Sequence, residues 1–280
     1  MAAPTLSVCF ANYNYARYLP KCLTGVLHQS FTDFEVIVTD DGSTDGSQDI
    51  LRDYARADSR LKVNYFSQNQ GIGPASKDVF ARMSGRYFYS TASDDFVVNK
   101  DFFQKAVTAL DRDSRPAAFY GLCGIFVDEQ GKLSGGMGTA EVEGYNTPVQ
   151  CCEGFLKCRS VVTTPSAIFR TEPFFAQGGR DFNELIRTLG PQVDYYLNHS
   201  VAFRYGVHFE KTLFSCQRVY EARTNYSANL QLWDTASRFA EMERLLRADG
   251  LPDYPGIEND WPRWRAYWMM DVIRKSGVVV

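Results

Sequence analysis

Short apolar runs alternate with segments of helical periodicity in the N-terminal part of the chain, and this alternation limits the fold more than any other feature. The predicted strands are Leu6–Phe10, Phe34–Thr39, Leu61–Phe66 and Arg86–Thr91. The first two are almost wholly apolar, which is typical of strands buried on both faces of a sheet. Between the strands, apolar residues recur at helical spacing, as in Leu19–Leu27. This order predicts an α/β fold with a mostly parallel sheet flanked by helices.

The second half of the sequence has a more mixed pattern. Helices are predicted over residues 102–110, 194–205 and 230–247, and strands over 117–127, 161–170 and 207–215. A further strand near Leu133 is expected to form a hairpin with 117–127 about residues 128–131. We expect segments 134–139 and 181–190 to be loops, and the first, which is rich in glycine, to be mobile. The second half is therefore predicted to add mixed strands and further helices to the parallel sheet.

Composition and charge exclude several classes of protein. The chain has 30 basic and 33 acidic residues and a net charge of −3, without a long block of one sign, so no surface for duplex nucleic acid is expected. No signal peptide pattern and no window of about 20 apolar residues is present, which predicts a cytoplasmic protein. The seven cysteines lack zinc-site spacing and are interpreted as reduced structural thiols.

Two acidic loops follow predicted strands. Asp40 and Asp41 follow the second strand, and Asp94 and Asp95 follow the fourth. Because ligands bind beyond the carboxyl ends of strands in such sheets, the two loops are expected to converge. There, carboxylates can accept hydrogen bonds from a base or sugar and hold a hard cation. A solvated or helix-capping turn is the alternative for each loop.

The second acidic pair has a further property. Consecutive residues that leave a strand project to opposite sides. In the Asp94 and Asp95 pair, one carboxylate can therefore bind a cation while the other fixes the loop or accepts a ligand hydroxyl. A divalent ion held by one or two carboxylates and by phosphate oxygens would neutralise a departing diphosphate.

Four segments together resemble the inverting family 2 glycosyltransferases of GT-A fold. They are LSVCFANYN (residues 6–14), FTDFEVIVTDDGSTDGS (31–47), NQGIG (69–73) and ASDD (92–95). The resemblance implies transfer of a sugar from a nucleotide diphosphate donor to an acceptor hydroxyl, with inversion and with Mg²⁺ or Mn²⁺ under the diphosphate. It also implies a hexosyltransferase-like role in polysaccharide or glycoconjugate synthesis, with a saccharide or lipid-linked acceptor.

The expected organisation follows from this resemblance. Residues 1–220 would form one GT-A domain, in which 1–100 bind the nucleotide sugar and 101–220 shape the acceptor side. Residues 221–280 would form a helical C-terminal extension.

The resemblance also implies a set of donor-site residues. They are Ala11, Asn12, Tyr13, Asp40, Asp41, Gly71, Asp94 and Arg218. Within this set, residues 11–13 would line the nucleotide, Asp40 or Asp41 would contact the base, and Asp94 would contact the ribose. Asp95 would bind the metal ion. Arg218 would reach the diphosphate, unless it is an ordinary surface arginine.

Three positions depart from the family pattern. Ala92 stands where the acidic motif usually begins with an aspartate, and Ser76 and Lys77 stand where an arginine and an asparagine are frequent. Lys77 or Arg82 could supply a cation for the diphosphate, with a solvated helix face as the alternative. The departures favour, as the second hypothesis, a non-catalytic nucleotide-sugar-binding or scaffolding protein.

Inverting transfer requires a carboxylate that accepts the proton of the acceptor hydroxyl. Segments 161–170 and 178–181 are similar to the part of the family that precedes its acceptor-side helix, which implies that Asp194 is the general base. Asp181 and Glu184 are the reserve candidates. The alternative is that Asp194 only caps its helix, whose positive end would lower its pKa.

The C-terminal segment is rich in tryptophan. Trp261, Trp264 and Trp268 are spaced three and four residues apart, which places them on one face of a helix. That face is expected to pack against the domain or against a second subunit in a homodimer. The alternative is a peripheral contact with the inner face of the membrane, where the acceptor would be lipid-linked.

Overall fold

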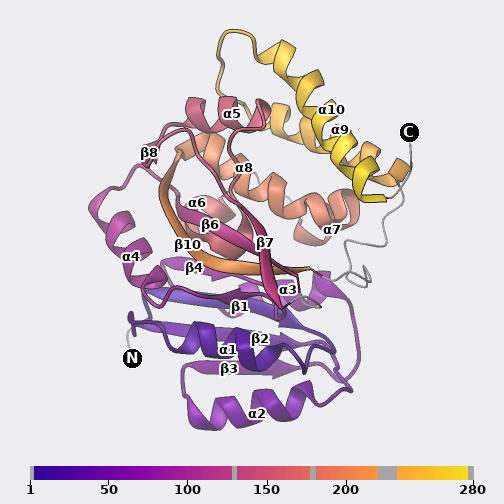
Figure 1. Cartoon of the computed structure of the whole chain (residues 1–280). Helices are drawn as coiled ribbons and strands as arrows, with labels where there is room; N and C mark the ends of the chain where they lie inside the picture. Colours follow the sequence, from indigo (N-terminus) through magenta and orange to yellow (C-terminus); the bar gives the residue numbers. More distant parts are fainter. Residues whose placement is uncertain (1–2, 128–130, 177–180, 220–231, 277–280) are drawn as a thin grey trace.

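The computed structural model describes residues 3–127, 131–176, 181–219 and 232–276, and its described strands form one mixed sheet (Figure 1). The strand order is β3-β2-β1-β4-β9-β6-β10-β5, with β7 beside β6 and β8 beside β10. The strands are β1 (Leu6–Asn12), β2 (Phe34–Asp40), β3 (Leu61–Tyr65), β4 (Tyr87–Ser90), β5 (Phe96–Val97), β6 (Ala118–Val127), β7 (Lys132–Met137), β8 (Gly144–Asn146), β9 (Ala167–Arg170) and β10 (Val207–Val219).

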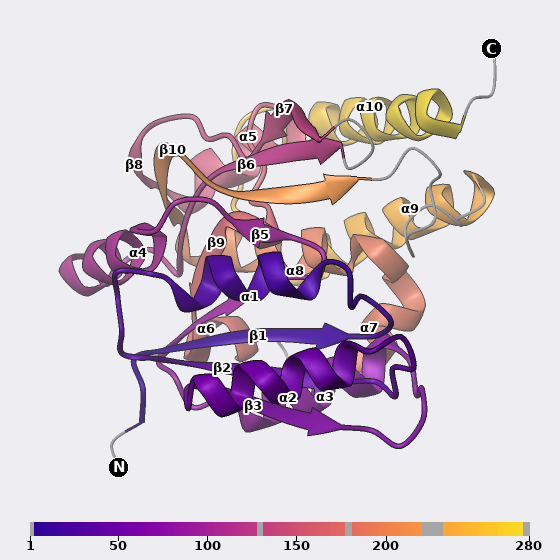
Figure 2. The same ribbon diagram turned by 60° about the horizontal axis from the view of Figure 1, so that its bottom comes forward.

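Helices cover both faces of this sheet (Figure 2). They are α1 (Leu19–Leu27), α2 (Ser47–Ala57), α3 (Ile72–Arg82), α4 (Phe102–Arg112), α5 (Pro148–Leu156), α6 (Thr171–Phe175), α7 (Phe182–Leu189), α8 (Val193–Tyr205), α9 (Leu232–Ala248) and α10 (Ile257–Ser276). Two short 3₁₀ turns, η1 (Thr164–Ser166) and η2 (Gly190–Gln192), precede β9 and α8. None of the described helices combines the length and the apolar character that crossing a bilayer requires.

Strand direction brings several carboxyl ends to one edge of the sheet. Strands β1, β2, β3 and β4 run parallel. Strand β9 is antiparallel to both β4 and β6, so β4 and β6 point the same way, and β10 is parallel to β6. The ends of β1, β2, β4 and β10 therefore lie at the same edge, although β10 is separated from β4 by more than a hundred residues of chain.

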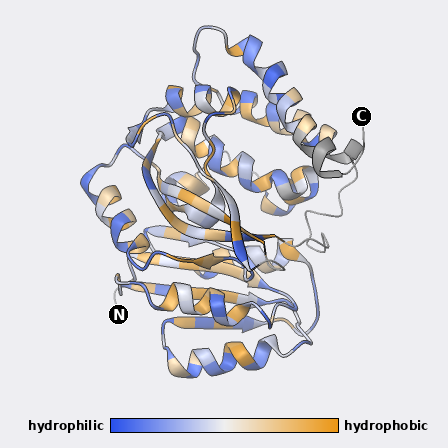
Figure 3. Cartoon of the chain, viewed as in Figure 1, coloured by the Kyte–Doolittle hydropathy of each residue, from blue (hydrophilic) through white to orange (hydrophobic). Residues whose placement is uncertain are grey.

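Side-chain alternation along the strands explains why both faces are covered. In β1, Leu6, Val8 and Phe10 pack with α1 and its neighbours, whereas Cys9 faces the other side and packs with Val79 of α3. These residues are buried, as a strand between two helical layers requires. Figure 3 shows hydrophobic residues along the central strands and hydrophilic residues on the outer turns of helices. The predicted α/β class is thus confirmed.

Two predicted loops are regular structure. Segment 134–139 lies largely in β7, which pairs with β6 in antiparallel register, so the prediction of a mobile loop is wrong. A Cβ atom on Gly136 would lie 3.2 Å from the carbonyl oxygen of Cys123, which explains the small residue there. Segment 181–190 is mostly α7, whose first turn is capped by Asp181. The proposed hairpin turn at residues 128–130 lies outside the described residues.

A third difference concerns the strand predicted over residues 161–170. Within this segment the strand is Ala167–Arg170, Val161 forms an isolated bridge with Thr139, and Thr164–Ser166 forms a 3₁₀ turn. Pro165 accounts for the turn, because proline has no backbone N–H to donate to a sheet and fixes φ at a helical value. This turn lies beside α8 and becomes important for the candidate site.

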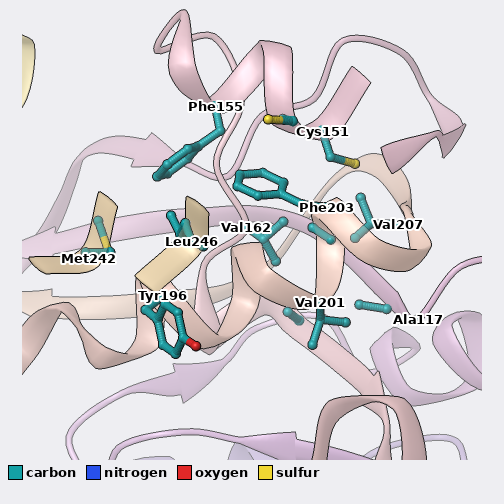
Figure 4. Packing of buried hydrophobic residues seen from close by; sticks show 14 of the residues in the cluster. Ala117, Cys151, Phe155, Val162, Tyr196, Val201, Phe203, Val207, Met242 and Leu246 are labelled. Atoms are coloured by element: carbon teal, nitrogen blue, oxygen red, sulfur yellow. The ribbon is translucent and has the colours of Figure 1, made fainter. Parts of the chain in front are cut away.

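The C-terminal helices share a hydrophobic core with α5 and α8 (Figure 4). Trp261 and Trp264 are fully buried in this cluster, and Trp268 packs against it. The predicted packing of the tryptophan face against the domain is confirmed. Since the two buried indoles have no exposed surface, they cannot form a membrane contact, and any such contact would need other residues.

Trp264 offers a test of this packing. Trp264→Ala is expected to lower the free energy of unfolding by about 3–5 kcal/mol, because the buried indole is replaced by a cavity. Tyr267→Ala on the same helix is the matched control, since Tyr267 is 52% exposed and its loss should change stability by at most about 0.5 kcal/mol. Urea denaturation measures both. Equal effects would contradict the packing of α10 on the domain.

Candidate active site

The loops after β1 and β2 are held together by side chains at the edge of the sheet. Asn12, which is 2% exposed, ends β1. Its amide Nδ2 donates to Asp40 Oδ2 at 2.8 Å and to Ser43 Oγ at 3.2 Å. The backbone N–H of Asp41 donates to the carbonyl of Asn12 at 2.8 Å. The two loops therefore form one rigid unit beside the end of the central strand.

The carboxylates of Asp40 and Asp41 both accept hydrogen bonds from groups within the protein. Asp40 is fully buried, and its Oδ1 accepts from the backbone N–H of Ser43 and from Gln48, both at 2.9 Å. Asp41 Oδ1 and Oδ2 accept from the backbone N–H groups of Gln70 and Gly71 at 2.7 and 2.8 Å. Asp41 thus joins the loop after β2 to the loop that enters α3. A direct contact of either carboxylate with a base stays a prediction.

Ser43 and Asp45, which the sequence interpretation did not include in the donor site, complete this loop unit. Ser43 Oγ also accepts from the backbone N–H of Asn14 at 2.9 Å, and Asp45 accepts from the backbone N–H of Ala16 at 2.8 Å. Tyr13, at the tip of the loop, is 42% exposed. The alternation of Asp, Ser and Asp at positions 41, 43 and 45 was the available signal, because such side chains accept backbone hydrogen bonds in turns.

The second acidic pair lies against the end of β10. The backbone N–H of Arg218 donates to Asp95 Oδ1 at 2.9 Å, and Arg218 Nε donates to the backbone carbonyl of Asp94 at 3.0 Å. Asp95 is only 5% exposed, whereas Asp94 is partly exposed. Arg218 is also buried, with its guanidinium over the ring of Tyr18. Arg218 is therefore a structural neighbour of the acidic pair and not a surface arginine.

Electrostatics show that these carboxylates share one region with Asp194. The pKa of Asp95 lies well above its usual range, first because burial disfavours the charged form and second because of the negative charge of Asp94. The charge of Asp194 acts in the same direction, and the backbone N–H and guanidinium of Arg218 oppose it. Burial and the same acidic pair raise the pKa of Tyr15 to about 12.

Asp194 lies in the first turn of α8 and is exposed to solvent. The protein around this carboxyl group disfavours its charged form and raises the pKa of Asp194 to about 6, and the Thr164 side chain opposes this shift. The net shift of this pKa is upward, which is the direction that burial gives and not the lowering that a helix end alone would give. The residue before the helix is Gln192, without a side-chain cap. Asp194 is therefore not the cap of its helix.

Asp181, one of the two reserve candidates for the base, and Arg82, one of the two candidate cations, have structural roles. Asp181 caps α7 by accepting from the backbone N–H of Glu184 at 3.0 Å. Arg82 is paired with Asp78 at 2.9 Å and donates to Thr39 Oγ1 at 2.7 Å, which fixes α3 to β2. These contacts argue against Arg82 as a ligand of the diphosphate. Lys77 and Ala92 are exposed, and Ser76 is partly exposed.

The donor atoms at the acidic pair suit a hard divalent cation. Carboxylate oxygens are the protein ligands that Mg²⁺ and Mn²⁺ prefer. Among the residues that the structure describes, no group of three or more His, Cys, Asp or Glu side chains could hold a metal.

The fold is the GT-A fold. The structure of residues 1–349 of TarS from S. aureus matches 99% of this chain and 76% of its own, with a TM-score of 0.69 and 17% identity. A mannosyltransferase from Pyrobaculum calidifontis, PcManGT, solved with GDP-Man and Mn²⁺, matches 100% of this chain and 77% of its own, with a TM-score of 0.61 and 17% identity. At this level of identity the two likenesses concern the fold.

The sequence places the chain within one family of this fold. The profile described as "Glycosyl transferase family 2" matches residues 7–147, half of the chain. TuaG of Bacillus subtilis strain 168, named for teichuronic acid biosynthesis, is 39% identical over 92 residues, which are 33% of this chain and 36% of TuaG. The chain thus spans about a third of the length of this relative. The chain belongs to glycosyl transferase family 2.

Proposed function

We propose that this chain is an inverting glycosyltransferase that moves a sugar from a nucleotide diphosphate to an acceptor hydroxyl. The observation that supports this most strongly is the convergence of the Asp94 and Asp95 pair, Arg218 and Asp194, which come from three distant parts of the sequence. Acidic groups that are close enough to interact electrostatically, at the edge of the sheet where ligands bind, suit a displacement in which one carboxylate acts as base.

We assign binding of the nucleotide-sugar donor to the loops after β1 and β2 and to the loop that leads into α3. Ala11, Asn12 and Tyr13 would line the nucleotide, and Asp41 would shape the loop that begins at Gly71. The backbone of Gly71 has φ +92°, and a Cβ there would meet no atom within 4 Å, so the backbone faces open space. A TarS structure holds UDP-GlcNAc and PcManGT holds GDP-Man, which supports a nucleotide sugar as the donor class.

A divalent cation, Mg²⁺ or Mn²⁺, is assigned to the acidic pair, where it would stabilise the charge of the leaving diphosphate when bound. The geometry favours roles for Asp94 and Asp95 that differ from those that the sequence resemblance implied. Asp95 is nearly buried and its Oδ1 accepts from Arg218, so it is the residue that fixes the loop. Asp94 is the more exposed carboxylate. We assign the ion to Asp94, with Asp95 as the alternative.

The proposed reaction is a single displacement. Asp194 accepts the proton of the acceptor hydroxyl, the acceptor oxygen forms a bond to the anomeric carbon, and the bond from that carbon to the diphosphate oxygen breaks. The diphosphate leaves with the electron pair, and the configuration of the sugar inverts. A base pKa of about 6 suits this role, because Asp194 is then ionised near neutral pH yet more basic than an ordinary aspartate.

The biological setting proposed is polysaccharide or glycoconjugate synthesis in the cytoplasm, with a saccharide or lipid-linked acceptor. The name of TuaG supports this setting.

A donor screen tests the function against the hypothesis of a non-catalytic binding protein. The full chain is incubated with Mn²⁺, a panel of nucleotide sugars and a panel of saccharide acceptors. We expect release of nucleoside diphosphate from at least one donor, and an inverted anomeric configuration of the product by NMR. Donors that bind by calorimetry without any release or transfer would favour the binding protein instead.

A further inference from the structure

The guanidinium of Arg218 lies over three aromatic rings from separate parts of the chain. Its central carbon is 4.7 Å from the ring centroid of Tyr18, which directly precedes α1. It is 5.4 Å from the centroid of Phe96 in β5 and 5.2 Å from that of Phe126 in β6. A cation over a ring face is attracted to it within about 6 Å. Because Arg218 is also only 5% exposed, these rings fix the position of its guanidinium.

Arg218 contacts the acidic pair through both its side chain and its backbone. The side-chain Nε donates to the backbone carbonyl of Asp94 at 3.0 Å, and the backbone N–H donates to Asp95 Oδ1 at 2.9 Å. The carbonyl of Asp94 belongs to the peptide that joins the two aspartates. The first bond therefore restrains the backbone between the two carboxylates, and the second restrains the side chain of Asp95.

The side-chain contact requires an arginine. The guanidinium is planar, so Nε can donate in the plane while the face of the group lies over aromatic rings. A lysine has a compact charge at the end of a flexible chain and cannot satisfy both requirements at once. Arg218→Lys would thus keep the positive charge beside the acidic pair but lose the geometry of the contact.

Tyr18 connects Arg218 to the loop after β1. The backbone N–H of Tyr18 donates to the carbonyl of Tyr15 at 2.9 Å, and the two rings are 5.7 Å apart. Between them, the backbone N–H of Ala16 donates to Asp45 at 2.8 Å, which joins this segment to the loop after β2. The loops assigned to the nucleotide and the loop of the acidic pair are therefore linked through Tyr18 and Arg218.

We propose that Arg218 and Tyr18 are positioning residues for the cation site at Asp94 and Asp95. The inference rests on the proposed function. Arg218 holds the acidic pair in one orientation, and Tyr18 holds the guanidinium of Arg218 and relates it to the loop after β1. Groups that orient metal-binding side chains from outside the ligand set affect metal affinity strongly. This role differs from the contact with the diphosphate that the sequence resemblance implied for Arg218, because Nε is bonded to the protein.

Mn²⁺ affinity tests the role of Arg218. The full chain is titrated with Mn²⁺ alone, and the free ion is measured by electron paramagnetic resonance. We expect Arg218→Lys to weaken binding by about tenfold to a hundredfold. The matched control is Arg60→Lys at the opposite edge of the sheet, where Arg60 lies 4.3 Å from the ring of Phe34 and donates to the carbonyl of Leu27 at 2.9 Å. This control loses a similar contact and should bind Mn²⁺ as the wild type does.

Two variants of Tyr18 test the link in the same titration. Tyr18→Leu removes the ring and should weaken Mn²⁺ binding by about two- to fivefold. Tyr18→Phe keeps the ring and should behave as the wild type. Thermal unfolding shows whether each variant is folded. If Arg218→Lys does not fold, the comparison of Tyr18→Leu with Tyr18→Phe decides.

A second measurement needs no metal. The Nε–H of Arg218 is observed by ¹⁵N NMR in metal-free buffer and is assigned by its absence in Arg218→Lys. We expect this proton to exchange slowly with solvent in the wild type and in Tyr18→Phe, and faster in Tyr18→Leu, because the guanidinium is then less firmly held.

The outcomes separate this inference from the proposed function. Equal Mn²⁺ affinity of Arg218→Lys and the wild type, an equal loss in Arg60→Lys, or equally slow exchange in Tyr18→Leu would overturn the inference. If the wild type binds no Mn²⁺, or if neither Asp94→Asn nor Asp95→Asn weakens its binding, the proposed cation site is wrong and the inference fails with it.

Discussion

Asp194→Asn is expected to lower kcat by about 10²- to 10⁴-fold, the range that general base catalysis contributes. Asparagine has nearly the same shape but cannot accept the proton of the acceptor hydroxyl. The affinity for the nucleotide should be unchanged, because the loops assigned to the nucleotide follow β1 and β2, whereas Asp194 lies on α8. Release of nucleoside diphosphate measures turnover, and isothermal titration calorimetry with the nucleoside diphosphate measures binding.

The pH dependence provides the control for this prediction. Since the pKa of Asp194 is raised to about 6, the base is ionised above that pH and protonated below it. The wild-type rate should therefore fall as the pH falls through 6, and the residual rate of Asp194→Asn should not show this decrease. Glu184→Gln, which alters an exposed carboxylate on the neighbouring α7, should behave as wild type. Near-normal turnover of Asp194→Asn would assign the base to another residue.

The second large effect is expected at the acidic pair. Asp94→Asn should lower metal-dependent turnover by about a hundredfold or more, since the ion would lose its protein ligand and its several kcal/mol of transition-state stabilisation. Asp95→Asn should keep turnover within about tenfold, because the new side-chain oxygen still accepts from the N–H of Arg218 and a costly buried charge is removed. Rates are measured over a range of Mn²⁺ concentrations after treatment with EDTA.

Two outcomes would change this assignment. If Asp95→Asn loses metal dependence and Asp94→Asn does not, Asp95 is the ligand, as the sequence resemblance implied. If wild-type turnover persists in EDTA at its full rate, the reaction does not depend on a divalent ion. Thermal unfolding of both variants serves as the control for folding. Asp95→Asn should not be less stable than the wild type, because the pKa of Asp95 shows that its charged form is disfavoured in the fold.

Much of the fold could be predicted from the sequence. Leu19–Leu27 was predicted with the bounds that the structure gives, and the four N-terminal strands agree to within two residues at their ends. Local periodicity carries this information, because a strand or helix between two layers must repeat its apolar residues at a fixed spacing. The strand predicted near Leu133 is β7, but its glycine-rich part was predicted as a loop, because its structure depends on pairing with β6. Helix α7 was also predicted as a loop, although Phe182, Leu185 and Leu189 recur at helical spacing.

The candidate site could be predicted from the sequence only in part. The sequence identified the acidic residues, since carboxylates after strands mark the binding edge of a parallel sheet. It did not reveal that Asp95 is bonded to Arg218, 123 residues further along the chain. Nor did it reveal the 3₁₀ turn Thr164–Ser166, which was predicted to lie in a strand. A polar residue whose partner is far away in sequence leaves no periodic signal.

The sequence by itself thus determined the α/β class, the family and the set of carboxylates from which the site is built. The tertiary structure decided which of them are buried, which accept hydrogen bonds from the protein and which are exposed near Asp194. The physical reason is that periodicity and motif chemistry depend on residues close in the chain. Burial, pKa and hydrogen-bond direction depend instead on groups that only folding brings together.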